Sequence, residues 1–217
     1  MRILIEVPTY DGRISQATSE SLWRLDRCGH DVDYKPRTGY GCGMARNRMA
    51  ADALNAGYGR LLMVDNDIAL PTDALANLLE HDVDMCMGYY LNRYARGKGM
   101  YTTLYKDGHG WQMYSADELR ELRDSGEHLI RVKGGGMGCC LFKPQVFRAL
   151  PFPWFEWTDL ARETLNVGDV YACHDAFRSG GEDINFCNLA RKHGFQIHAD
   201  TRVACGHEFR EVRWPEQ

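Results

Sequence analysis

Two aspartates separated by one residue, Asp65 and Asp67, directly follow an apolar run at residues 61–64. Four apolar residues in a row are typical of a strand covered on both faces, so the acids stand where that strand ends. Side chains at positions i and i+2 of an extended segment point the same way, so the two carboxylates can converge. Carboxylates that close repel unless a cation lies between them, and Mg²⁺ and Mn²⁺ prefer such oxygen ligands. A nucleoside diphosphate would complete the shell of such an ion.

The same Asp65-Asn66-Asp67 sequence is equally typical of a turn. Asp and Asn side chains hydrogen-bond to the backbone of turns, and a strand followed by an acidic turn is common. The local sequence therefore supports a metal site and a simple turn about equally.

A second acidic pair, Glu182 and Asp183, follows two glycines and opens a segment that we expect to be helical to about His193. Acids are favoured in the first turn of a helix by the partial positive charge of its exposed amides, which alone can explain the pair. The functional interpretation is a carboxylate that binds an acceptor hydroxyl or removes its proton. Farther on, His207 is either a surface imidazole or a ligand for a borderline metal such as Mn²⁺.

Two glycine-rich segments have a structural and a functional interpretation. The run at 134–138 permits close approach of the backbone to a ligand, and it equally permits a tight bend between strands. The segment 37–43 leads into a predicted helix at 44–56, where Arg46 and Asn47 can contact a nucleotide through side chains and exposed amides. The alternative is an ordinary exposed helix face that contains an arginine.

Strands and helices must position these groups. Their sequence signals alternate along the chain, which predicts an α/β fold with a mostly parallel central sheet. The first strand ends at Pro8-Thr9-Tyr10, in a loop of the kind where open α/β sheets bind ligands. Short aromatic segments and a capped polar helix predict an insertion near 89–132. We expect strands at 3–7, 32–35, 61–64, 83–87, 128–132, 139–142, 195–198 and 201–205, and helices at 15–28, at 44–56 and from beyond Pro71 through Leu79.

Composition places the chain among ordinary globular proteins, with 44% hydrophobic and 26% charged residues. We expect a single domain over 1–217. The chain has no apolar run of membrane-spanning length and no secretory signal, so we expect a cytoplasmic protein. Its 8 cysteines are scattered without metal-type pair spacing and predict reduced thiols. A formal charge of −4 gives no overall attraction for nucleic acid.

The order of the motifs is more specific than any one of them. It comprises Val-Pro-Thr-Tyr at the end of the first strand, Ala45-Arg46-Asn47, 64–67, 135–142, 181–187 and 205–207. This ordered set, from residue 1 to about His207, resembles the family 2-like glycosyltransferases with the GT-A fold. Asp65 and Asp67 match the family's DXD motif, the Gly-Glu-Asp at 181–183 its acceptor-side motif, and His207 the late metal ligand of many members.

The resemblance implies a Rossmann-like three-layer sandwich and a hexosyltransferase-type enzyme that moves a sugar from a UDP- or GDP-sugar to an acceptor hydroxyl. It implies Mn²⁺ or Mg²⁺ on Asp65, Asp67 and His207, with Asp183 or Glu182 as the base if the sugar's configuration inverts. The implied donor-binding residues are Pro8, Thr9, Tyr10, Arg46, Asp65, Asn66, Asp67, Gly135 and Gly136.

Several alternatives stay open at this point. A metal-binding histidine is frequent among retaining relatives and the Glu-Asp motif among inverting ones, so stereochemistry is not assigned. The acceptor can be a saccharide, a protein, a small metabolite or a modified nucleic-acid base. A nucleotidyltransferase that makes a nucleotide sugar normally has a glycine-rich, basic loop after the first strand, where this chain has a single glycine, Gly12. A non-catalytic nucleotide-sugar-binding protein with the same fold is the third possibility.

Overall fold

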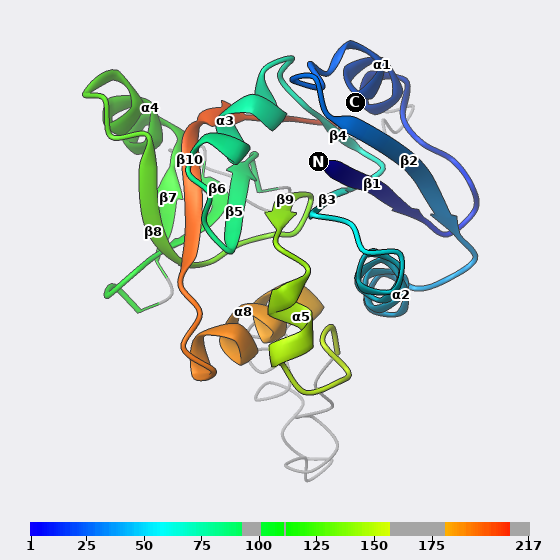
Figure 1. Ribbon diagram of the computed structural model, residues 1–217. Helices are drawn as coiled ribbons and strands as arrows, with labels where there is room; N and C mark the ends of the chain where they lie inside the picture. Colours follow the sequence, from blue (N-terminus) through cyan, green and yellow to red (C-terminus); the bar gives the residue numbers. More distant parts are fainter. Residues whose placement is uncertain (93–100, 111, 157–180, 209–217) are drawn as a thin grey trace, which may run out of the picture.

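A nine-stranded sheet runs through the molecule and is covered by helices on both faces (Figure 1). This computed structural model describes residues 1–92, 101–110, 112–156 and 181–208. The strands of the sheet are β1 (Arg2–Thr9), β2 (Asp31–Thr38), β3 (Arg60–Val64), β5 (Met85–Tyr89), β6 (Tyr101–Lys106), β7 (Met113–Ser115), β8 (Leu129–Gly134), β9 (Cys139–Phe142) and β10 (Ile197–Ala204). Two further short strands, β4 (Ile68–Ala69) and β11 (Gly206–His207), pair with each other.

The strand order is β2-β1-β3-β9-β5-β10-β8-β6-β7. Strands β2, β1, β3, β5, β10 and β6 run in one direction, and β9, β8 and β7 run in the other. Most strands therefore share one direction, which confirms the predicted fold class. The segment predicted as an insertion near 89–132 contributes β6, β7 and part of β8 to the antiparallel end of this same sheet. A role of that segment on the acceptor side stays a prediction.

Strand β3 shows why the sheet must be covered twice, because its side chains alternate between two buried faces. Leu61 and Met63 belong to one hydrophobic cluster, and Leu62 and Val64 belong to the other. The first cluster includes residues of α2 (Cys42–Asn55), α5 (Gln145–Ala149) and α8 (Glu182–Lys192), and the second includes α3 (Ala74–Glu80). Figure 1 shows α2, α5 and α8 on one side of the sheet and α3 with α1 (Gln16–Arg24) on the other.

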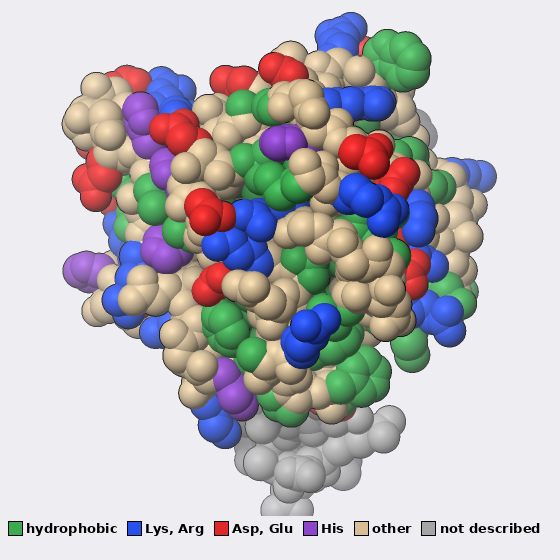
Figure 2. Space-filling view, in the orientation of Figure 1, with side chains coloured by type: hydrophobic (Ala, Val, Ile, Leu, Met, Phe, Trp, Pro, Cys, Tyr) green, Lys and Arg blue, Asp and Glu red, His purple; other side chains and the backbone are tan. Residues whose placement is uncertain are grey.

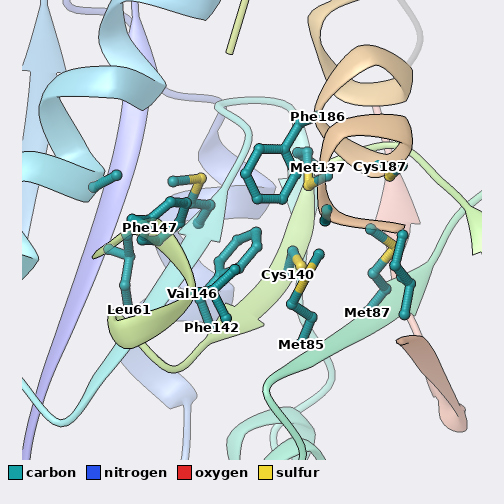
Figure 3. Packing of buried hydrophobic residues seen from close by; sticks show 14 of the residues in the cluster. Leu61, Met85, Met87, Met137, Cys140, Phe142, Val146, Phe147, Phe186 and Cys187 are labelled. Carbon is teal, nitrogen blue, oxygen red and sulfur yellow. The ribbon is translucent and has the colours of Figure 1, made fainter. Parts of the chain in front are cut away.

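Aromatic packing fixes the position of α8, which carries the second acidic pair. The ring of Phe186 stacks on Phe155 with centroids 4.4 Å apart and meets Phe142 of β9 edge-on at 5.7 Å. Figure 3 shows Phe186 directed toward Phe142 and Phe147. Offset and edge-on aromatic pairs of this kind add to the hydrophobic burial, so the start of α8 is held firmly over the sheet.

The predicted elements are largely confirmed, with differences at their ends. Helix α1 ends at Arg24 because Leu25 turns to an extended backbone and buries its side chain. The two strands predicted at 195–198 and 201–205 form the single strand β10. The capping box on α4 (Ala116–Asp124) is present, with Ser115 and Glu118 bonding each other's backbone. Within the described ranges, none of the helices is long and apolar enough to cross a lipid bilayer.

Acidic and basic side chains are interspersed over the face shown in Figure 2. Binding of nucleic acid by charge requires a large area that carries basic residues alone. Among the described residues of that face, no such area is present.

Candidate active site

The predicted site residues follow strands that end at one edge of the sheet. Strands β1, β3, β5 and β10 share one direction, so the loops that follow them meet at that edge. The segments that follow these strands contain Tyr10, Asp65, Tyr90 and His207, the last of them on the short strand β11. Open α/β sheets bind their ligands outside the carboxyl ends of the strands, which makes this edge the candidate site.

Asp65 and Asp67 lie on a turn, as the second of the two sequence interpretations predicts, and not at positions i and i+2 of an extended segment. The amide of Ile68 donates to the carbonyl of Asp65 at 3.1 Å, which closes the turn. The amide of Asp65 donates to the carbonyl of Gly138 at 3.0 Å and so joins the turn to the glycine-rich run. Each aspartate consequently faces a different side chain: Arg46 contacts Asp65, and His207 Nε2 lies 3.6 Å from Asp67 Oδ2.

Arg46 of α2 lies at the centre of a buried cluster of carboxylates. Its side chain is 2% exposed, and its Nη2 lies 2.8 Å from Asp65 Oδ1. Its Nη1 lies 2.9 Å from Asp183 Oδ1 and also donates to Glu182 Oε1. Burial lowers the pKa of Arg46, but the carboxylates of Asp183, Asp65 and Glu182 outweigh it and raise that pKa well above the usual value. The guanidinium therefore faces acids of the protein, and the expected contact with a nucleoside has no support here.

The two acids at the start of α8 differ in access. Glu182 is 6% exposed and bonds Arg46, whereas the Asp183 side chain keeps 23% of its surface exposed. Asp183 Oδ2 accepts a hydrogen bond from the amide of Met137 at 3.2 Å. Burial raises the pKa of Asp183 to about 7; Arg46 opposes this rise and the Glu182 and Asp65 charges add to it. Asp183 is thus the accessible acid of the pair, and it titrates near neutral pH.

His207 is oriented in a way that fits a divalent cation. Its Nδ1 lies 2.8 Å from the carbonyl oxygen of Leu91, which can only accept, so Nδ1 carries the proton. In the neutral ring Nε2 is then an acceptor, and it faces Asp67 Oδ2 at 3.6 Å. Two acceptors that face each other need a proton or a cation between them. A carbonyl that fixes the other ring nitrogen is also the usual support of a metal-binding histidine.

Asp65 does not complete this pair as the family resemblance implies. Across the described part of the chain, no three His, Cys, Asp or Glu side chains lie close enough together to hold a metal ion. Asp65 bonds Arg46 instead. The residues present therefore fit a cation with two protein ligands, Asp67 and His207. Mg²⁺ commonly binds through one or two carboxylates, with water and phosphate oxygens completing its shell.

The glycines at 134–138 are needed for packing between protein groups. A Cβ built on Gly136 would lie 2.3 Å from Tyr90 Oη, and one on Gly138 would lie 2.7 Å from the same atom. A Cβ on Gly135 would lie 2.8 Å from a methyl carbon of Leu104. Close packing against Tyr90 and Leu104 therefore accounts for these glycines, and donor binding by Gly135 and Gly136 stays a prediction.

The loop after β1 is held by side chains that were predicted to bind the donor. The Thr9 hydroxyl donates to the carbonyl of Arg13 at 2.8 Å, and Asn66 Nδ2 donates to the same oxygen at 2.9 Å. Pro8 is buried at the end of β1. Tyr10 is 78% exposed beside this fixed loop, so its ring has a free face for stacking.

Two residues have roles that sequence reasoning missed. The Oη of Tyr90 accepts the amide of Gly138 at 3.0 Å, and its ring meets the ring of His207 edge-on at 5.2 Å. Asn47, predicted to contact a nucleotide, bonds the backbone of Phe155 and Trp154 instead. A tyrosine directly after a buried strand is a weak signal for the first role. The partners of Asn47 lie more than a hundred positions away, so no local signal exists for the second.

Comparisons with known proteins identify the fold. No protein-family model and no curated protein sequence matches the chain. Among solved structures, A197 from STIV matches with a TM-score of 0.59 and 16% identity, over 97% of this chain and 87% of that one. GalNAc-T7, solved with UDP, GalNAc and Mn²⁺, matches with a TM-score of 0.59 and 12% identity over 100% of this chain. S. aureus TarS, solved in complex with UDP, matches with a TM-score of 0.50 and 14% identity over 95% of it.

The chain spans 44% of the GalNAc-T7 chain and 60% of the TarS chain, so these two proteins contain much that this chain does not match. Identities this low show the fold alone. The mixed α/β fold, with its large and mostly parallel central sheet, matches the GT-A fold of these two glycosyltransferases.

Proposed function

We propose that this chain is a metal-dependent glycosyltransferase that moves a hexose from a UDP- or GDP-sugar to an acceptor hydroxyl. The observation that carries the proposal is the meeting of two groups at the carboxyl edge of a GT-A sheet. One group is the Arg46 cluster with its accessible acid Asp183, and the other is the pair Asp67 and His207. The matching structures of GalNAc-T7 and TarS hold UDP, which supports a nucleotide donor.

On the donor side, Asp67 and His207 would hold Mn²⁺ or Mg²⁺. When bound, such an ion would neutralise the negative charge that develops on the departing diphosphate. The exposed ring of Tyr10 is placed to stack on the nucleobase, while Thr9 and Asn66 hold the loop that carries it. The hydrogen bonds of Thr9 and Asn66 fix the backbone of this loop, so less backbone entropy would be lost when the donor binds.

On the acceptor side, Asp183 is the proposed base of an inverting transfer. The acceptor oxygen forms a bond to the anomeric carbon, the bond to the diphosphate breaks with its electron pair on the leaving oxygen, and the acceptor proton moves to Asp183. A base with a pKa near the working pH is the efficient choice for such a step, and burial raises the pKa of Asp183 to about 7.

The free thiols of the described cysteines support a reducing compartment, and we place the protein in the cytoplasm on that ground. They are Cys28, Cys42, Cys86, Cys139, Cys140, Cys187 and Cys205.

The function is tested by incubating the protein with UDP- and GDP-sugars and Mn²⁺ and measuring release of the nucleoside diphosphate. Slow hydrolysis without an acceptor, accelerated by hydroxyl compounds that become glycosylated, is the expected result. Release of pyrophosphate from a nucleoside triphosphate and a sugar phosphate would instead identify a nucleotidyltransferase. Binding of the donor without turnover would identify a non-catalytic binding protein.

A further inference from the structure

We infer that Arg46 is a positioning residue that holds the acceptor acid Asp183 in place and links it to Asp65 on the donor side, without contacting the donor. This inference rests on the proposed function. It replaces the role near the nucleoside that the family resemblance implies for Arg46.

The surroundings of Arg46 leave it little freedom to do anything else. The side chain is 2% exposed, and its helix is anchored in the core through Met49, Ala50 and Ala53. The next residue, Asn47, bonds the backbone at Phe155 and at Gly43 and so fixes the first turn of the helix to the aromatic loop. Within the described part of the chain, the guanidinium is therefore directed at one set of partners, the carboxylates of Asp65, Glu182 and Asp183.

The two terminal nitrogens of the planar guanidinium contact different partners. Nη2 contacts Asp65, and Nη1 contacts both Glu182 and Asp183. A guanidinium presents its donors in a rigid fork, so a shift of Asp65 is transmitted to the two acids of α8. Among the described residues, Arg46 Nε has no hydrogen-bond partner, which leaves the two Nη groups as the linking atoms.

Asp183 is oriented from two sides. The amide of Met137 donates to Oδ2 at 3.2 Å, and Arg46 Nη1 attracts the buried Oδ1 as an ion pair at 2.9 Å that lacks hydrogen-bond geometry. Removal of Arg46 leaves one fixed oxygen and puts three carboxylates together without their cation. The carboxylate of Asp183 can then rotate away from the acceptor, so the loss should fall on the transfer step.

A double-mutant cycle tests this, using Arg46→Gln, Asp183→Asn and the double variant, each measured for kcat and for donor Kd with Mn²⁺ saturating. In the wild-type background, Arg46→Gln should lower kcat by about tenfold to a hundredfold. In the Asp183→Asn background the same substitution should lower kcat by less than about threefold, because a residue that acts through another loses its effect when that partner is gone. Donor Kd should stay within about threefold, since Arg46 does not contact the donor. Arg46→Lys keeps the charge but loses the fork, so its kcat should lie between that of Arg46→Gln and that of the wild type.

Two outcomes overturn the assignment of Arg46 alone. A donor Kd raised by more than about tenfold with kcat unchanged would show that Arg46 binds the donor. Independent, multiplying losses in the double variant would show that it does not act through Asp183. If Arg46→Gln fails to fold, Arg46→Lys takes its place in the cycle. A wild-type protein that turns over no nucleotide sugar overturns the proposed function, and the role of Arg46 with it.

Discussion

At the scale of single residues, the two acids that open α8 should behave differently in spite of being neighbours. Asp183 is accessible and Glu182 is buried against Arg46. Asp183→Asn nearly preserves shape but removes basicity, so transfer should fall by roughly a hundredfold or more while donor affinity changes little. Glu182→Gln is the matched control and should keep most of the transfer rate. Near wild-type transfer by both variants would favour a retaining mechanism or a purely structural pair.

The pH dependence of transfer should report the raised pKa of Asp183. The base must be ionised, and burial raises its pKa to about 7, so kcat/KM should rise as pH increases through about 7. An aspartate with an ordinary pKa of about 3.9 would give a flat profile above about pH 5. Rates of the wild type measured between about pH 5 and 9 should show this rise. Glu182→Gln should move the rise to lower pH, because the Glu182 charge adds to the raised pKa of Asp183; a flat profile in the wild type would contradict the prediction.

The raised pKa of Asp183 also makes the stability of the fold depend on pH, in the direction opposite to that of an aspartate whose pKa is lowered by folding. The folded protein holds the Asp183 proton more tightly than the unfolded chain does, so this group's contribution to stability is present below about pH 4 and is lost as pH rises to about 7. Asp183→Asn removes this dependence, which urea unfolding of wild type and variant without metal would show.

The residue types at the site were predictable, but their pairings were not. The sequence places Asp65, Asp183 and His207 after strands or at a helix start, and the sheet brings those ends to one edge. The turn at 65–68 directs Asp65 to Arg46 and Asp67 to His207. The interpretation of this segment as extended excluded these pairings. Burial of Arg46 and the change in the Asp183 pKa follow from the packing of distant segments, which no local pattern contains.

At the scale of elements, the glycine-rich run before β9 should depend on Tyr90. Gly136→Ala puts a Cβ 2.3 Å from Tyr90 Oη, so it should destabilise the protein by roughly 1 to 3 kcal/mol. In a Tyr90→Phe background that oxygen is absent and the next atom, Tyr90 Cζ, is 3.1 Å away, so the same substitution should cost much less. Urea unfolding of the four proteins of this cycle measures the difference.

Tyr90→Phe alone serves as the control, since losing the bond to the Gly138 amide should cost about 1 kcal/mol. Equal losses from Gly136→Ala in both backgrounds would mean that another contact requires the glycine.

Strands and helices of this size were predicted well because their apolar periodicity is local. The reason for each glycine was not, because Tyr90 and Leu104 come from other segments of the chain.

At the scale of the whole molecule, the fold follows from the order of its strands and helices. Buried runs such as β3 alternate with amphipathic helices, and this alternation by itself predicts a sheet with two helical layers. The antiparallel direction of β9, β8 and β7 was not predicted, because the direction of a strand depends on the connections that lead to it.

The central claim is that Asp67 and His207 bind a divalent ion together with a nucleoside diphosphate. The most direct measurement is thermal unfolding with UDP or GDP, each with and without Mn²⁺, for wild type, Asp67→Ala, Asp65→Ala and the exposed control Asp117→Ala on α4. Nucleotide and ion together should stabilise wild type and Asp117→Ala by about 2.7 kcal/mol at roughly 100 times Kd, and either alone should do little. Asp67→Ala should lose this stabilisation, and Asp65→Ala should keep most of it, because Asp65 pairs with Arg46. Equal, metal-dependent stabilisation of all four proteins, or none in wild type with either nucleotide, would contradict the account.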